Sequence, residues 1–208
     1  MAFRGEKEKA ALIDRLAAKV RRRRDDEGVA DAARFLRDFY RHVVPEDILP
    51  INPADLVGAA GSIWDHVQTR KPGQPKIRII NPAAERDGWS SPHTVIEIVN
   101  DDMPFLVDSV TAELLRLRLV VHLVIHPVIR VRRNKSGRLM ELCDPKAEGA
   151  GIVTESVMHI EIGPPIQGEF QQAVQAGLDS VLGDVRAAVE DWPAMRQRIR
   201  ACRARLAV

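Results

Sequence analysis

Residues 93–110 read HTVIEIVNDDMPFLVDSV, and this stretch decides the fold. Its first half alternates, so that alternate residues from Thr94 to Ile98 would lie on one side of a β-strand. From Pro104 the apolar residues recur at helical spacing as far as about Arg118. The sequence therefore predicts a strand over residues 93–100 that passes directly into a helix, as in a sheet covered by helices.

The residues after this helix return to the alternating pattern. We expect a long strand over residues 120–132, a hairpin turn at 134–137, a return strand over 138–142 and another strand over 155–162. On the long strand, one face is expected to carry Val121, Leu123, Ile125, Ile129 and Val131.

Two helices are expected to close the chain, over residues 169–182 and 184–204. Gly183 would join them, and Trp192-Pro193 would bend the second. The chain ends within a basic helical pattern, so we expect it to be part of a longer polypeptide.

This order of elements predicts an α+β fold, a ferredoxin-like βαββαβ open sandwich with a mainly antiparallel sheet. Helices would cover one face, and the other face would be more polar. The strict version of this fold ends with a strand after the second helix, which the sequence lacks. We expect a strand over residues 76–81 to fill that position from the N-terminal side.

A helical lead-in precedes the sheet. Helical spacing extends over residues 7–24 and again from Val29 to Tyr40, and a third helix is expected to begin at Asn52-Pro53, where asparagine would cap it and proline would occupy its first position. The predicted domains are residues 1–72 (helical segment), 73–183 (α+β domain) and 184–208 (C-terminal helix).

Composition places the chain among ordinary soluble proteins. A net charge of +2 gives no general preference for nucleic acid or membranes. No apolar run is long enough for a signal peptide or a membrane span. Cys143 and Cys202 lie far apart, which favours two reduced thiols over a disulfide or a metal site. We therefore expect a cytoplasmic protein.

Carboxylates gather where the first strand meets its helix, and they form the first candidate ligand site. Backbone N–H groups at a helix N-terminus can bind a ligand carboxylate, and an acidic side chain nearby can bind an ammonium group. Acidic residues at this place also simply stabilise the helix. The candidate residues are Asn100, Asp101, Asp102, Asp108 and Ser109.

A second candidate is a cluster on the more polar sheet face. His122 and His126 lie four apart on the predicted long strand and would share a face. If the strands are neighbours, the cluster would comprise His93, Glu97, His122, His126, His159 and Glu161. Such a group could bind Zn²⁺, but no short-spaced ligand motif accompanies it. We therefore predict no metal and a polar face packed against another module or subunit.

Two further kinds of site have little support. The glycine pair Gly58-Ala-Ala-Gly61 lies within a helical pattern and not between a strand and a helix, so we predict no NAD site here. An RNA-binding sheet usually presents aromatic residues, which make up only 4% of this chain. The basic residues that could contact RNA are Arg21–Arg24, Arg130, Arg132, Arg133, Lys135 and Arg138.

The stretch His93–Val110 resembles the N-terminal region of the large bacterial NAD-specific glutamate dehydrogenases. Other strings agree with that family in the same order: Phe39-Tyr40, Trp64, Asn81-Pro82, Gly88-Trp89, His126-Pro127 and residues 155–161, ESVMHIE. The resemblance implies an ACT-like module, a type that senses amino acids and mediates subunit contacts. Asp102-Met-Pro-Phe-Leu106 is similar to the Asp-x-Pro-Gly-Leu turn of ACT domains, except that Phe105 stands at the glycine position.

The resemblance implies a regulatory and assembly segment without catalytic residues. Its partners would be the rest of the polypeptide, further copies in a homo-oligomer and an amino-acid effector, with NAD bound elsewhere in the full-length enzyme. Two alternatives stay open: an autonomous metal-dependent enzyme using the His/Glu cluster, and an RNA-binding α/β domain.

Overall fold

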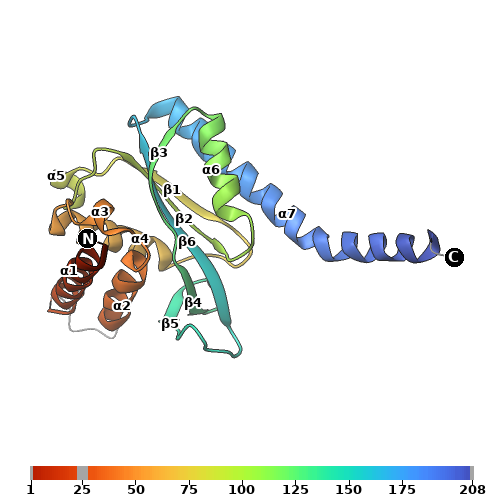
Figure 1. Cartoon of the computed structure of the whole chain (residues 1–208), viewed down its shortest axis with the longest axis horizontal. Helices are drawn as coiled ribbons and strands as arrows, with labels where there is room; N and C mark the ends of the chain where they lie inside the picture. Colours follow the sequence, from red (N-terminus) through yellow and green to blue (C-terminus); the bar gives the residue numbers. More distant parts are fainter. Residues whose placement is uncertain (1, 23–27, 207–208) are drawn as a thin grey trace.

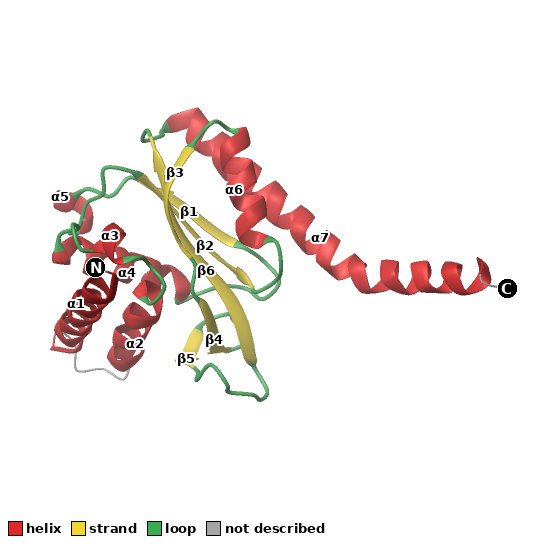
Figure 2. Ribbon diagram, in the orientation of Figure 1, coloured by secondary structure: helices red, strands yellow, loops and turns green. Residues whose placement is uncertain are grey.

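The computed structural model describes residues 2–22 and 28–206, and this part of the chain forms one sheet with helices on both sides (Figure 1, Figure 2). All strand pairs are antiparallel, in the order β1-β2-β6-β4-β5, and β3 also pairs with β6. The strands are β1 (Lys76–Ile80), β2 (Thr94–Asp101), β3 (Val120–Ile125), β4 (Val128–Arg133), β5 (Leu139–Leu142) and β6 (Ile152–Gly163). This arrangement confirms the predicted α+β fold with an open antiparallel sheet.

The helices within the described residues are α1 (Ala2–Arg22), α2 (Gly28–Tyr40), α3 (Pro45–Ile48), α4 (Pro53–Val67), α5 (Ala84–Asp87), α6 (Leu106–Arg116) and α7 (Gly168–Leu206). The helix predicted at Asn52-Pro53 is confirmed. The Asn52 side chain accepts a hydrogen bond from the Ala54 N–H at 2.9 Å, and Pro53 occupies the first turn. Arg23 and Arg24 of the basic run lie outside the described residues, as do the side chains of Arg21 and Arg22.

One sheet face packs against α6 and α7. Ile96 and Ile98 of β2 and Met158 and Ile160 of β6 form its centre. The helices contribute Leu106, Val110, Leu114, Val174, Leu178 and Leu182 to the same core. The strand residues lie on the same face of the sheet, as the alternation in the sequence predicts. The helix residues have the predicted helical spacing.

The opposite face was expected to be more polar and to pack against another module or subunit, but helices of this chain cover it. Helices α1 to α4 cover it, and their apolar stripes share a core with this face (Figure 1). Glu97, Glu155 and His159 lie on this face and are buried. Because the lead-in helices must bury Leu16, Phe35, Phe39 and Ile63, they occupy the surface that the sequence left for another module.

Strand β1 forms the edge of the sheet beside β2, with Lys76 opposite Val99 and Ile80 opposite Val95. A βαββαβ sheet places its last strand beside its first, and here β1 occupies that place although it comes earlier in the chain. The expectation for residues 76–81 is thus confirmed.

The predicted long strand over 120–132 is two strands. Pro127 has no N–H for the ladder, and the chain breaks at His126-Pro127 between β3 and β4. Both strands still pair with β6. A register shift between Val121 and Leu123 also changes the side-chain alternation. Val121 therefore packs with the α6–α7 core, whereas Leu123 packs with the lead-in core.

A single helix, α7, replaces the two helices predicted over 169–182 and 184–204. Gly183 and Pro193 both lie inside it. The first half packs on the sheet, and the second half projects away from the body along a changed direction (Figure 1). A glycine lowers helix propensity by only about 1 kcal/mol, which packing of Leu182 and Val185 can offset.

Candidate functional site

A cavity of about 400 Å³ lies between the lead-in helices and the sheet. The end of α2, helices α3 and α4, and the loop after α5 form one wall, and β3 and β6 form the other. Four residues of the predicted His/Glu cluster line it: His93, His122, His159 and Glu161. Its other lining residues are Tyr40, Asp47, Ile48, Ile51, Asp55, Leu56, Ala59, Trp89, Ser90, Ser91, Pro92, Leu123 and Ile125.

Two histidines stack in the cavity wall. The rings of His93 and His122 lie 4.1 Å apart between centroids with an interplanar angle of 19°. Gly163 permits this pair, because a Cβ at this position would lie 2.6 Å from His122 Nε2. The register shift in β3 brings His122 to this side.

His159 lies deeper, and its side chain is 1% exposed. Its Nε2 lies 3.6 Å from Glu161 Oε1, and the Phe39 ring meets its ring edge-to-face at 5.6 Å. In the tautomer with its proton on Nε2, which faces the Glu161 carboxylate, Nδ1 is a hydrogen-bond acceptor. Nδ1 is buried and has no hydrogen-bond partner.

The other two residues of the predicted cluster lie elsewhere. Glu97 pairs with Arg78 of β1, whose Nε donates to Glu97 Oε2 at 2.8 Å. His126 lies 2.6 Å from Ser156 Oγ and does not line the cavity, and burial lowers its pKa. The expectation that His122 and His126 share a face is wrong, because the register shift and the break at Pro127 separate them.

The cluster does not form a metal site. Among the described residues, no group of three or more His, Cys, Asp or Glu side chains is arranged to hold a metal ion. In the part of the chain that the structure describes, no helix is both long enough and apolar enough to cross a bilayer.

Of the two glycines in α4, Gly58 serves packing, and neither lies at a dinucleotide-binding turn. A Cβ at Gly58 would lie 2.2 Å from the Cβ of Trp89, whereas a Cβ at Gly61 would meet nothing within 4 Å. An NAD site needs a glycine-rich turn between a strand and a helix. Gly58 and Gly61 instead lie inside a helix, so they do not fit this cofactor.

The second predicted site, at the start of α6, is partly occupied by structural contacts. Both Asn100 and Asp101 accept hydrogen bonds from Arg186 Nη2, at 3.2 and 2.6 Å. Burial would raise the pKa of Asp101, but hydrogen bonds from Arg186 and Arg70 outweigh it and hold that pKa below its usual value. Asp102 and Asp108 are exposed beside the helix N-terminus, and Ser109 is half-buried.

Phe105 precedes α6 with φ of 71°, in the left-handed region that favours glycine. Its side chain is 66% exposed. Phe105 therefore does not pack into the core, whereas the next residue, Leu106, does. The turn keeps the backbone geometry of a glycine although a phenylalanine occupies the position.

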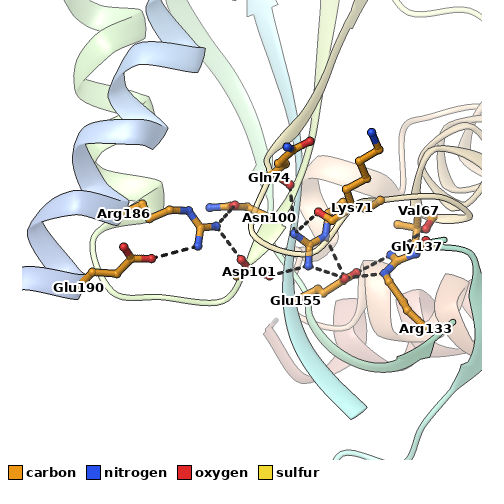
Figure 3. Close-up of polar contacts among 11 residues, drawn as sticks. Val67, Lys71, Gln74, Asn100, Asp101, Arg133, Gly137, Glu155, Arg186 and Glu190 are labelled. Atoms are coloured by element: carbon orange, nitrogen blue, oxygen red, sulfur yellow. Dashed lines mark hydrogen bonds and ion pairs between the residues drawn. The ribbon is translucent and has the colours of Figure 1, made fainter. Parts of the chain in front are cut away.

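A buried network of charges joins the lead-in to the sheet, and sequence reasoning missed it (Figure 3). Glu155 of β6 accepts hydrogen bonds from Arg70 and Arg133. Arg70 also reaches Asp101, which Arg186 of α7 binds from the other side. The sequence signal that could have revealed this network is a charged residue on a buried strand face, since Glu155 shares a face with Val157.

The comparisons with known proteins agree with this architecture. A family model described as glutamate dehydrogenase, ACT1 domain, matches residues 35–178. The chain belongs to this family. The ACT1 match begins in α2 and ends in the packed half of α7. It includes the cavity, the turn at Phe105 and the buried pairs of Glu155 with Arg70 and Arg133.

Relatives of this ACT1 chain carry the name NAD-specific glutamate dehydrogenase. The Halomonas elongata protein is 36% identical over 196 residues, and the Pseudomonas aeruginosa protein is 31% identical over 200 residues. These matches cover 94% and 96% of this chain but only 12% of each relative. The Mycobacterium tuberculosis protein is 32% identical over 101 residues, 48% of this chain and 6% of the relative.

Proposed function

We propose that this chain is a non-catalytic regulatory and assembly module of an NAD-specific glutamate dehydrogenase. The whole polypeptide would oxidise glutamate with NAD to 2-oxoglutarate and ammonium. The names of the relatives support this proposal, as does the 12% of their length that the chain spans. NAD would bind outside this chain, because the described residues offer no strand, glycine-rich turn and helix in sequence.

The exposed stripe on α7 carries the assembly role. Trp192, Met195 and Ile199 are 54%, 50% and 61% exposed. Their spacing places them on one helix face, in the half of α7 that projects from the body (Figure 1). Single exposed apolar residues are common, but three aligned on a projecting helix are typical of a surface that packs against a partner.

The charges beside the stripe indicate what that partner is. Residues 192–203 contain Arg196, Arg198, Arg200 and Arg203 and no acidic residue. A second α7 packed on this stripe would bring these arginines together, which like-charge repulsion disfavours. We therefore assign the stripe to an apolar surface with an acidic rim in the remainder of the same polypeptide.

The test uses full-length enzyme that contains this chain. The triple variant W192E/M195E/I199E should reduce assembly in sedimentation velocity and lower glutamate-dependent NADH formation. The matched control A194E/Q197E/A201E adds the same charge to the opposite face of the helix, where all three residues are exposed, and should behave as wild type. Equal behaviour of the two variants contradicts the assembly role.

Amino-acid sensing at the start of α6 is the regulatory part of the proposal. The exposed carboxylates of Asp102 and Asp108 and the glycine-like geometry at Phe105 support it. Calorimetric titration with a panel of amino acids tests it. Saturable binding of one amino acid that is lost in Asp102→Ala is the expected result. If no amino acid of the panel binds, the sensing role is contradicted and only the assembly role remains.

A further inference from the structure

We propose that the cavity beneath the lead-in helices binds a small aliphatic organic cation, with an ammonium or guanidinium group. This inference goes beyond the assembly role and does not depend on it. The site lies on the sheet face opposite α6, apart from the turn at Phe105.

The ionisable groups of the cavity favour a cation. Three carboxylates line it, from Asp47, Asp55 and Glu161, and no lysine or arginine is among the lining residues. Within the described residues, no lysine or arginine forms an ion pair with any of the three. Carboxylates on a concave wall raise the local concentration of cations.

Asp55 is hydrogen-bonded to neutral groups of Ser90. Its Oδ1 accepts hydrogen bonds from the Ser90 N–H at 2.8 Å and from Ser90 Oγ at 3.4 Å. These bonds fix the loop after α5 against α4 but leave the negative charge uncompensated. Asp47 is exposed in the first turn of α3, so a charged group can approach it from solvent.

His159 provides an independent indication of a ligand. Its Nδ1 is buried without a partner, although buried polar atoms in folded proteins are nearly always hydrogen-bonded. In the tautomer that carries its proton on Nε2, the nitrogen nearer Glu161, Nδ1 is an acceptor that needs a donor. The N–H of an ammonium or guanidinium group is such a donor, and an anion is not.

The remaining lining suits an aliphatic body. Ile48, Leu56 and Trp89 contribute buried apolar surface. Tyr40 uses its hydroxyl to donate to the Leu56 carbonyl at 2.7 Å, so the phenol adds a ring and no free donor. Burial and the neighbouring Glu161 raise the pKa of Tyr40, which keeps the phenol protonated. A volume of about 400 Å³ lies within the range of small-molecule sites.

The test compares two aliphatic cations with an aliphatic dianion on the full chain. Putrescine and agmatine are titrated by calorimetry and by NMR chemical-shift perturbation, with succinate as the anionic counterpart. We expect saturable binding of a cation and none of succinate up to about 10 mM, the range of weak small-ligand affinity. The perturbed resonances should include those of Trp89 and His159.

The variant D47N/E161Q should weaken cation binding by about tenfold or more. The control D191N/E148Q removes the same charge from exposed positions outside the cavity lining and should bind as wild type. If E161Q impairs folding, D47N alone carries the test, because its side chain is exposed. Absence of saturable cation binding, equal binding of succinate or an unchanged affinity in D47N/E161Q overturns the proposal. Each of these outcomes leaves the assembly test on α7 unaffected.

Discussion

Arg70 and Glu155 are 85 positions apart in the sequence, and their side chains meet at 2.7 Å with 1% and 0% of their surface exposed. Arg70 follows the last lead-in helix, and Glu155 lies in the central strand β6. Arg133 binds the same carboxylate and also donates to the Val67 carbonyl at the end of α4. This relationship fixes the lead-in on the sheet.

Loss of the central carboxylate should destabilise the fold strongly. Glu155→Gln leaves Arg133 without its buried counter-charge and Arg70 with Asp101 alone. Removing one partner of a buried pair costs about 3–5 kcal/mol in the free energy of unfolding. Urea denaturation at pH 7 measures this loss in the free energy of unfolding. The control is Glu141→Gln, which breaks an exposed pair with Arg132 and should cost less than about 1 kcal/mol. Similar losses in both variants would contradict the network's role.

Two glycines three positions apart in α4 should respond in opposite directions. Gly58→Ala places a methyl group against Trp89 and should destabilise by about 1–3 kcal/mol, as overpacked cores do. Gly61→Ala meets open space and should stabilise by about 0.5–1 kcal/mol through helix propensity. Thermal unfolding of the two variants provides the comparison, and a stabilising Gly58→Ala would disprove the close contact.

The turn before α6 should prefer glycine to any other residue. Phe105→Gly and Phe105→Ala both remove the exposed ring, so their difference reports the backbone alone. Because φ is 71°, we expect the glycine variant to be more stable than the alanine variant by about 1 kcal/mol. Chemical denaturation measures this difference, and equal stability of the two variants would argue against the left-handed conformation.

His66 should make stability fall in mild acid. Burial and the charge of Lys76 lower its pKa to about 4. Between pH 6.5 and about pH 4, His66 therefore binds a proton in the unfolded chain, where its pKa is near 6.5, but not in the folded chain. The contribution of neutral His66 to the free energy of unfolding is fully present above the unfolded pKa. It is lost as the pH falls from that value toward the folded pKa. Between pH 7 and pH 5, wild type should lose about 2 kcal/mol more than His66→Gln in urea titrations. Equal losses would mean that the imidazole is not buried neutral.

The sequence alone was sufficient for the elements whose signals are local. Alternation in residues 93–100 and the cap at Asn52 specified β2 and the start of α4. The place of β1 followed from the fold rule that a βαββαβ sheet needs a strand beside its first.

Other features depend on contacts far apart in the chain and left no local signal. The register shift at His122 depends on pairing with β6, and it brings His122 beside His93 and away from His126. Burial of Glu155 depends on two arginines, Arg70 after α4 and Arg133 of β4. Continuation of α7 through Gly183 reflects tertiary packing that outweighs local propensity.

Amide hydrogen exchange over residues 190–203 of α7 tests the assembly account most directly. In this chain alone, the exposed second half of the helix should exchange quickly, since few contacts protect it. In the proposed full-length polypeptide that contains this chain, the same amides should exchange at least about tenfold more slowly. Equal exchange in the two proteins would show that nothing packs on Trp192, Met195 and Ile199 and would contradict the account.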